Sequence, residues 1–262
     1  MAKTVLVTGA GGYIGRHVVT ALLERGLDVK ALDLRLDGVD ERAQKLSLDL
    51  FSGDANIYDQ MGRPDVVLHM AWRDGFKHAS SAHMDDLAKH VHLIENLYAG
   101  GLKHLAVMGT MHEVGYWEGA IDESSPCNPA SLYGIAKNAL REATFLSAKT
   151  HDAVAQWIRA YYIVGDDKFG NSIFSKLLEA AEEGRTTFPF TTGKNRYDFI
   201  SVDELATQIA AIVDQAEVNG VINACTGEPM SLAERVEAYI RDNDLDITLE
   251  YGAFPDRPYD SP

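Results

Sequence analysis

Residues 8–15 of the chain read Thr-Gly-Ala-Gly-Gly-Tyr-Ile-Gly, and this short stretch decides the fold. It lies between a β-rich run and residues 13–25, whose apolar side chains recur at helical spacing. Gly9 permits a tight turn, Gly12 permits a pyrophosphate to approach the backbone, and Gly15 permits close packing of the helix on the strand. Free N–H groups and the positive dipole end at the start of the helix favour a phosphate there. The stretch therefore predicts a strand, a dinucleotide-binding turn and a helix.

Strand and helix patterns alternate through the first half of the chain. Short apolar runs typical of strands alternate with two longer helical patterns, at residues 84–99 and 133–149. The strand-like runs are residues 4–8, 28–32, 44–48, 66–69, 104–108 and 154–159. Apolar strands that alternate with helices are typical of a parallel sheet covered on both faces. We therefore expect an α/β fold with a doubly wound parallel sheet of the Rossmann type.

An acidic residue, Asp33, follows the second strand-like run. A carboxylate there accepts hydrogen bonds from the ribose hydroxyls of an adenosine and repels the additional phosphate of NADP. NAD is therefore the expected cofactor, although Arg35 nearby offers a partner for that phosphate and leaves NADP as an alternative. Asp49 and Leu50, after the third run, are candidates to flank the adenine, and Asp at a strand end is also a common turn former.

The pattern loosens after Gly165. Gly, Phe, Thr and Asn are common as far as residue 196. Beyond it the sequence predicts helices at residues 202–215 and 231–242 and strands at residues 221–224 and 247–251. We expect residues 1–165 to form the NAD-binding Rossmann domain. Residues 166–262 are expected to form a smaller C-terminal α/β substrate-binding lobe, interleaved with the first domain.

The composition excludes several other classes of protein. The 262 residues include 39 Asp and Glu against 24 Lys and Arg, and the net charge of −15 disfavours binding to nucleic acid. Cys127 and Cys225 are too widely spaced for a disulfide framework or a metal site, and no metal is expected. No run approaches the roughly 20 apolar residues of a membrane helix. Residues 5–7 are too short an apolar run for a signal peptide, so a cytoplasmic location without membrane attachment is expected.

Tyr133 and Lys137 open the second long helical pattern. Residues four apart share one face of a helix, and a Lys ammonium beside a phenol stabilises the phenolate. Such a Tyr exchanges a proton with an alcohol or ketone while a hydride moves to or from a nicotinamide. Thr110, at the end of the fifth strand, is placed to hydrogen-bond the reacting oxygen. These residues predict an oxidoreductase.

Together these features resemble the extended short-chain dehydrogenase/reductase family, in particular its NAD-dependent nucleotide-sugar epimerases and dehydratases. The resemblance covers nearly the whole chain. It rests on residues 8–15, Asp33, residues 69–71, residues 110–115, Tyr133 with Lys137, residues 196–203 and residues 224–232. The chain departs from its relatives at Met108-Gly109, where paired serines are common, and it ends soon after Arg257, where relatives continue for another helix.

The resemblance implies a role for each matching residue. Tyr133 would be the catalytic acid/base, Lys137 its partner and a ribose ligand, and Thr110 the donor to the substrate oxygen. The residues expected to contact the cofactor are Gly9, Gly12, Tyr13, Ile14, Gly15, Asp33, Arg35, Asp49, Leu50, Ala71, Tyr133 and Lys137. The family also implies a homodimer, formed through the helices at residues 84–99 and 133–149.

The loop after Thr110 separates the reactions of the family. Dehydratases carry Asp-Glu directly after this Thr, whereas this chain has Met111-His112, with Glu113 one place later. The sequence therefore disfavours 4,6-dehydration. Hydride transfer at C4 of a nucleotide-diphosphate sugar remains, either by a 4-epimerase that retains NAD or by a 4-ketosugar reductase that exchanges it. The NAD preference indicated by Asp33 slightly favours the epimerase.

The substrate anchors are a separate set of candidates. Arg196 and Arg257 are candidates to bind the nucleotide pyrophosphate through bidentate hydrogen bonds. Tyr162 stands where relatives commonly carry a substrate-binding Asn. The whole set is Met111, His112, Tyr162, Asn171, Arg196 and Arg257.

Two other functions fit parts of the sequence. Thr110-Met111-His112 followed by Gly115-Tyr116-Trp117 is similar to the loop of NAD-dependent uronate dehydrogenases, which act on a free sugar. A non-catalytic, NAD-binding regulatory protein is a third possibility. Such proteins typically lose the Tyr or the Lys of the catalytic pair, and this chain has both.

Overall fold

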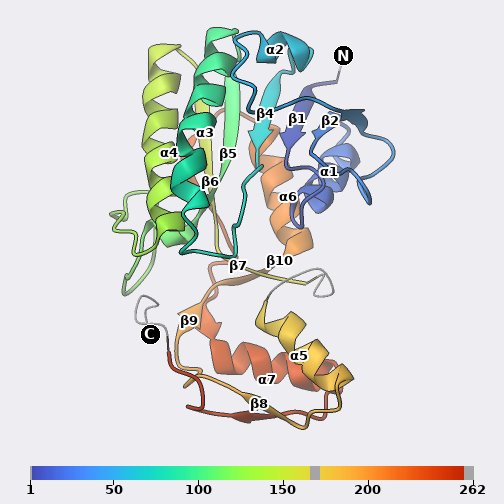
Figure 1. Cartoon of the computed structure of the whole chain (residues 1–262), viewed down its shortest axis with the longest axis vertical. Helices are drawn as coiled ribbons and strands as arrows, with labels where there is room; N and C mark the ends of the chain where they lie inside the picture. Colours follow the sequence, from blue (N-terminus) through green and yellow to red (C-terminus); the bar gives the residue numbers. More distant parts are fainter. Residues whose placement is uncertain (1, 166–171, 257–262) are drawn as a thin grey trace.

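Seven parallel strands form the central sheet of the molecule (Figure 1). The computed structural model describes residues 2–165 and 172–256. In spatial order the strands are β11 (Gly220–Ala224), β6 (Val154–Ala160), β5 (His104–Thr110), β4 (Val66–His69), β1 (Thr4–Thr8), β2 (Asp28–Leu32) and β3 (Gln44–Leu46). Every residue of β4 and β5 is buried, as expected for strands covered on both faces. The doubly wound Rossmann sheet expected from the sequence is confirmed.

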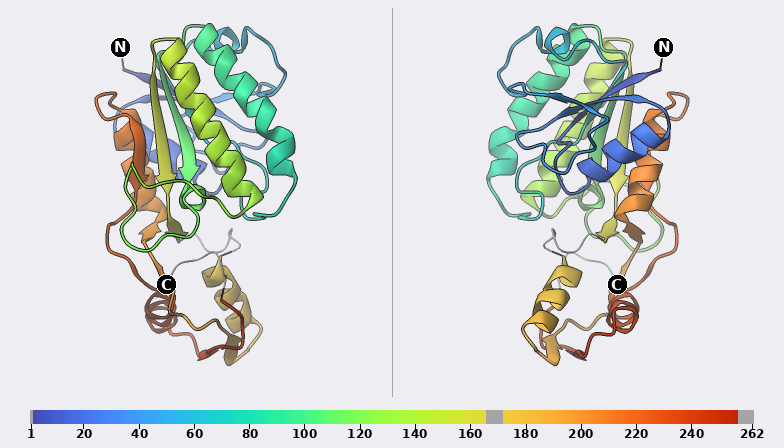
Figure 2. Two further views of the ribbon diagram at one scale, coloured as in Figure 1. Left: turned by 90° about the vertical axis from the view of Figure 1, so that its left-hand side faces the viewer. Right: turned by 90° about the vertical axis from the view of Figure 1, so that its right-hand side faces the viewer.

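Helices cover both faces of this sheet (Figure 2). On one face, α3 (Ala82–Ala99) and α4 (Leu132–Thr150) lie side by side, and on the other α1 (Gly15–Glu24) packs against α6 (Val202–Val213). The short helix α2 (Ile57–Gln60) precedes β4. Leu22 and Ile209 belong to the apolar core on the α1 side, and Leu97 and Leu140 to the core on the α3 side. The two layers hold the carboxyl ends of the strands in one row, where ligands of such folds bind.

Two segments that we assigned to the smaller lobe lie on the large sheet instead. The helix predicted at residues 202–215 is α6, which packs on α1, and the strand predicted at residues 221–224 is β11, which pairs in parallel with β6. The apolar side chains Leu205, Ile209 and Val213 join the core beneath α1. The chain thus returns to the Rossmann domain after entering the lobe, so a division at residue 165 separates the two regions only in part.

The remaining elements form the smaller lobe, below the sheet in Figure 1. Its helices are α5 (Ile173–Glu182) and α7 (Leu232–Asp242). Its strands pair as β8 (Thr187–Pro189) with β13 (Thr248–Glu250) and β9 (Arg196–Tyr197) with β12 (Met230–Ser231), while β7 (Tyr162–Val164) and β10 (Phe199–Ser201) pair beside the large sheet. Phe174, Leu177, Phe190 and Val236 give the lobe an apolar core of its own.

No helix within residues 2–165 and 172–256 combines the length and the apolar character needed to cross a bilayer.

Candidate functional site

The glycine turn between β1 and α1 is shaped by close backbone contacts. Gly9 has φ +73°, and a Cβ there would lie 2.7 Å from the amide nitrogen of Ala71. A Cβ on Gly15 would lie only 2.0 Å from the carbonyl oxygen of Gly9. At Gly12 the nearest atom is the same oxygen, at 3.2 Å. Packing therefore demands glycine at positions 9 and 15, while the smallness of Gly12 leaves room for a ligand to approach, which fits a dinucleotide pyrophosphate.

Asp33 follows β2 and faces the glycine turn. Its carboxylate accepts hydrogen bonds from the backbone amides of Gly11, at 2.9 Å, and Leu34, at 2.6 Å. The carbonyl oxygen of Arg35 lies so close that a Cβ on Gly11 would be 1.9 Å from it. The segment after β2 is thus fixed against the turn, with the Asp33 carboxylate at the edge where an adenosine ribose would lie. This arrangement fits NAD.

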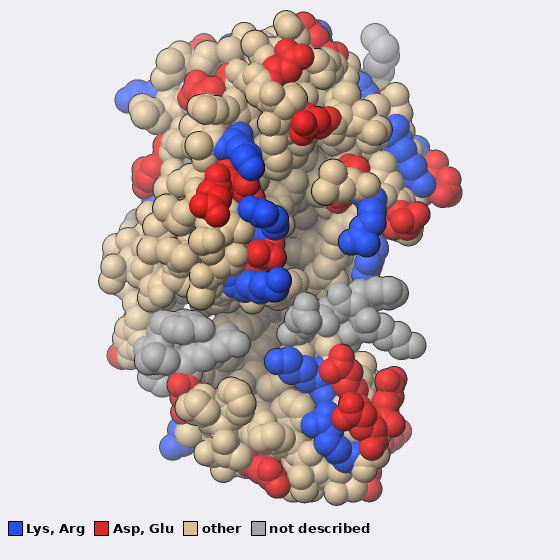
Figure 3. All heavy atoms as spheres, viewed as in Figure 1, with Lys and Arg blue, Asp and Glu red and all other residues tan. Residues whose placement is uncertain are grey.

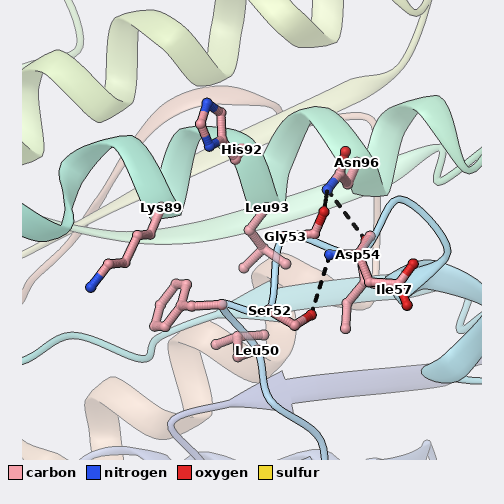
Figure 4. Close-up of a pocket in the computed structure, with 10 residues that line it drawn as sticks. Leu50, Ser52, Gly53, Asp54, Ile57, Lys89, His92, Leu93 and Asn96 are labelled. Carbon is pink, nitrogen blue, oxygen red and sulfur yellow. Dashed lines mark hydrogen bonds between the residues drawn. The ribbon is translucent and has the colours of Figure 1, made fainter.

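Asp49 behaves as a turn former. Its Oδ1 accepts a hydrogen bond from the amide of Phe51, two residues on, at 3.1 Å. Beyond it, a cavity of about 50 Å³ separates the loop from α3 (Figure 4). The cavity is lined by Leu50, Phe51, Ser52, Gly53, Asp54, Ile57, Lys89, His92, Leu93 and Asn96. A space of this size holds one or two waters and is too small for a dinucleotide.

Thr110 ends β5 and caps the 3-10 turn η1 (Met111–Glu113). Its Oγ1 accepts from the amide of His112 at 3.3 Å, and the Glu113 carboxylate accepts from the Thr110 amide at 2.8 Å. Glu113 is fully buried and also accepts from Trp157 Nε1 at 2.9 Å. Arg159 Nε lies 3.5 Å from its other oxygen. Burial raises the pKa of Glu113, whereas the Thr110 amide and the Arg159 charge act in the opposite direction. Glu113 therefore anchors the loop from within.

Tyr133 lies in the first turn of α4, within hydrogen-bonding reach of Thr110. Its backbone amide donates to the carbonyl of His78 at 3.1 Å, and the His78 ring stacks on the phenol ring at 5.2 Å with 11° between the planes. Burial raises the pKa of Tyr133; the hydrogen bond to Thr110 lowers it, and the Glu113 charge raises it. Three more rings surround the phenol: those of Trp72, His83 and His112. The structure thus brings together two of the three candidate catalytic residues directly.

Lys137 follows one turn later and is only 3% exposed. Its Nζ donates to the carbonyl oxygen of Met108 at 2.8 Å and lies 3.9 Å from the centre of the Trp72 ring. Burial lowers the pKa of Lys137 to about 7, and the Glu113 charge raises it. The site therefore holds a buried amine with a pKa of about 7, one helical turn from the candidate acid/base.

The candidate substrate residues are dispersed. Met111 and His112 lie in η1 next to Tyr133, where the His112 ring is 4.2 Å from that of His78. Tyr162 packs in the smaller lobe, its ring 3.9 Å from that of Tyr197. Arg196 donates to the carbonyl of Pro229 at 2.6 Å, also in the lobe. Asn171 and Arg257 lie outside the described residues.

The residues that the sequence analysis missed come from the segment after β4. Trp72, His78 and His83 all contact Tyr133 through their rings. Their position in the sequence could have indicated them, because a loop that follows a strand of a doubly wound sheet lies at the ligand-binding edge of the sheet. Residues 69–92, which begin at the end of β4, are rich in His and include Trp72.

The glycine turn, the carboxylate after β2 and the Tyr–Lys pair define a class: nicotinamide-dependent oxidoreductases of the short-chain dehydrogenase/reductase type. A sequence profile described as the NAD dependent epimerase/dehydratase family matches residues 5–225, and the chain belongs to this family. The resemblance stated from the sequence is therefore confirmed. So is NAD as the expected cofactor.

The chain is similar to three proteins of known or assigned activity, one by sequence and two by structure. The dTDP-6-deoxy-L-talose 4-dehydrogenase (NAD(+)) of Aggregatibacter actinomycetemcomitans is 41% identical over 264 residues, which cover 98% of this chain and 97% of that protein. The UDP-glucose 4-epimerase of Thermotoga maritima, solved with UDP-glucose, has a TM-score of 0.83 at 21% identity, covering 98% and 88% of the two chains. MoeE5, in complex with UDP-glucuronic acid and NAD, has a TM-score of 0.80 at 25% identity, covering 98% and 87%.

Proposed function

We propose that the protein is an NAD-dependent 4-dehydrogenase, or in reverse a 4-ketosugar reductase, of a thymidine-diphosphate-linked 6-deoxyhexose. One observation carries the choice of reaction: the 41% identity with a dTDP-6-deoxy-L-talose 4-dehydrogenase extends over almost the whole of both chains. The other relatives named above share at most 25% identity with this chain. The proposal thus favours the reductase over the epimerase that the NAD preference alone favoured.

The arrangement of Thr110, Tyr133 and Lys137 supports this chemistry. In the oxidative direction, the Tyr133 phenolate takes the proton of the C4 hydroxyl while the Thr110 hydroxyl hydrogen-bonds the same oxygen. The C4–H bond breaks and the C4–O double bond forms; the hydride acceptor would be the nicotinamide of NAD, held by the glycine turn and Asp33. Lys137, as ammonium, stabilises the phenolate form of Tyr133. In the reductive direction the protonated phenol returns its proton to the ketone oxygen.

The placement of Glu113 supports the choice against 4,6-dehydration. A dehydratase needs a carboxyl group that reaches the substrate to protonate a leaving hydroxyl. Glu113 is 0% exposed, and its oxygens accept from Thr110 and Trp157. We infer that it holds the loop and takes no part in acid catalysis.

The decisive experiment supplies purified protein with NAD and dTDP-6-deoxy-L-talose and follows nicotinamide absorbance. A 4-dehydrogenase forms NADH and a 4-ketosugar in equal amounts. A 4-epimerase converts the sugar without net NADH, and a uronate dehydrogenase forms NADH from a free uronate with no response to the nucleotide sugar. Tyr133→Phe should reduce turnover by about a thousandfold or more while NAD binding is retained. Epimerisation without NADH, or unchanged turnover in the variant, would refute the proposal.

A further inference from the structure

Trp72, the residue that follows Ala71 at the carboxyl end of β4, provides the aromatic surface against the buried Lys137. The Lys137 Nζ lies 3.9 Å from the centre of the indole ring and donates a hydrogen bond to the Met108 carbonyl. With its side chain 3% exposed, the amine has lost nearly all contact with bulk water. A cation over an indole face is stabilised by the ring quadrupole, most strongly where water is excluded.

The edge of the indole is fixed by His83. Trp72 Nε1 donates to His83 Nδ1 at 3.0 Å, and since an indole N–H is a donor only, that imidazole nitrogen must accept. The proton of His83 therefore resides on Nε2, which lies 3.0 Å from the carbonyl oxygen of Lys77 and donates to it. His83 is 1% exposed and is held at both nitrogens. The hydrogen bond to His83 thus orients the indole.

The indole also stacks on the end of a hydrogen-bonded row of imidazoles. His90 stacks on Trp72 at 4.5 Å with 22° between the planes. The Thr8 hydroxyl accepts from the amides of Met70 and Ala71, so its proton points to His69 Nδ1 at 2.8 Å. His69 then carries its own proton on Nε2 and donates to His90 Nδ1 at 2.8 Å. The row leads from the glycine-turn strand to the face of Trp72.

The charged and titratable groups around Lys137 come from four elements. Glu113 in η1 contributes a negative charge, and His69 on β4 and His90 on α3 stay neutral because burial lowers their pKa values. Tyr133 lies one turn away on α4 itself. Burial is the largest influence on the Lys137 pKa and lowers it, so a group that favours the ammonium is needed to keep the charge near neutral pH.

We propose that Trp72 is a positioning residue for catalysis, whose indole face holds the Lys137 side chain in place and favours its ammonium form. The inference rests on the proposed roles of Tyr133 and Lys137 in the reaction. Trp72 itself touches the amine and the Tyr133 ring, so it acts through the pair. The imidazoles of His69 and His90 stay neutral, so they add no positive charge that would oppose the ammonium.

The first test measures the Lys137 pKa directly in cofactor-free protein. The Cε resonances of isotopically labelled lysines are followed against pH, and the Lys137→Met spectrum identifies the signal. Trp72→Leu should lower the midpoint by about one pH unit, a tenfold change in the ammonium equilibrium, and Trp72→Phe should lower it by less because benzene attracts a cation more weakly. Phe51→Leu is the matched control: it removes another ring from the side of His90 and should leave the midpoint unchanged.

The second readout is the pH profile of alcohol oxidation. With less ammonium beside it, the Tyr133 phenolate is harder to form, so the acidic limb of kcat/KM should move to higher pH in the order wild type, Trp72→Phe, Trp72→Leu. If the wild type oxidises none of the sugars, the proposed function fails, yet the lysine titration still tests Trp72. A folded Trp72→Phe or Trp72→Leu protein with the wild-type midpoint would overturn the inference.

Discussion

Asp33 accepts hydrogen bonds from the glycine turn and from its own strand end, at the edge where the ribose of NAD is expected to bind. Asp33→Ala should weaken NAD binding by about tenfold or more, because hydrogen bonds to a charged acceptor contribute about 1.5–3 kcal/mol. It should weaken NADP binding less, since the repulsion between the carboxylate and the additional phosphate disappears. Titration of nicotinamide fluorescence with both reduced cofactors measures the two affinities.

The matched control for that experiment is Asp37→Ala. Asp37 lies on the same segment and is exposed, so its removal changes the net charge equally without touching the glycine turn. Both cofactor affinities should stay at wild-type values in this variant. An unchanged ratio of NAD to NADP affinity in Asp33→Ala would refute the ribose contact.

The buried pair of His69 and His90 should make the protein sensitive to acid. Burial lowers the pKa of His90 to about 3 and that of His69 well below its usual range. Below pH 6.5 the unfolded chain therefore binds more protons than the folded one, and the free energy of unfolding falls as the pH falls. With a folded-state pKa of about 3, His90 should contribute roughly 2 kcal/mol of this loss by pH 5, and His69 should add to the loss in the same direction.

Urea unfolding at pH 7.5 and pH 5 tests the histidine contribution. His90→Asn keeps an acceptor for His69 Nε2 and removes one titrating group, so it should lose less stability between the two pH values than the wild type. His92→Asn, on the exposed side of the same helix, should behave like the wild type. Equal pH dependence of all three proteins would contradict the assignment.

At the scale of elements, substitutions in the β1–α1 turn distinguish a glycine needed for packing from a glycine needed for NAD binding. Gly15→Ala brings a Cβ to 2.0 Å from a backbone oxygen and should destabilise the protein by about 1–3 kcal/mol. Gly12→Ala meets its nearest atom at 3.2 Å, so it should destabilise the protein less than Gly15→Ala does. Its methyl group would occupy the approach to the pyrophosphate, and NAD affinity should fall by about tenfold. Thermal unfolding and NAD titration of the two variants measure both effects. Full NAD affinity in Gly12→Ala would show that Gly12 does not make room for the pyrophosphate.

The elements that the sequence predicted well are those with local signals. The strands of the first half are apolar runs, and α3 and α4 carry long helical periodicity, so the expected positions agree with β1, β4, β5 and both helices. The short strands β8, β9 and β12 have two or three residues each and no periodicity to detect.

The misplacement of α6 and β11 has a different cause. Both elements were predicted near their actual bounds. The sequence pattern of an amphipathic helix or a short strand, however, does not indicate which sheet the element joins. In the candidate site, by contrast, Thr110, Tyr133 and Lys137 were predicted from their spacing and from the family resemblance. Trp72 was missed because its importance depends on a contact with Lys137 that only the folded chain creates.

At the scale of the whole molecule, acidic residues are in excess, but several basic side chains pair with an acidic neighbour. Basic and acidic side chains lie next to one another on the face shown in Figure 3. Near the candidate site Arg73 and Lys89 both pair with Asp86, and Lys77 pairs with Asp74. The negative net charge is thus compensated locally beside the edge where an anionic nucleotide sugar would bind, which reduces the repulsion that such a substrate would meet.

The outer face of α4 supports the expected homodimer. Ile135, Ala139 and Leu146 are exposed on one side of the helix, and Leu146 is 69% exposed. In Figure 2 this helix lies beside α3 at the surface, and Met84 of α3 is also exposed. Such apolar side chains favour burial against a second copy. Because a two-fold interface brings the same surface from both subunits, one substitution alters it twice.

Leu146→Arg should therefore convert the protein to a monomer at micromolar concentration without lowering its thermal stability as a folded chain. Two cations would be placed in or near the centre of the interface, where each must lose water without gaining a partner. Val218→Arg is the control, because Val218 is 59% exposed but follows α6 on the other side of the sheet. Sedimentation velocity distinguishes the two variants. A dimer that survives Leu146→Arg, or a wild type that sediments as a monomer throughout, would show that this face is not the interface.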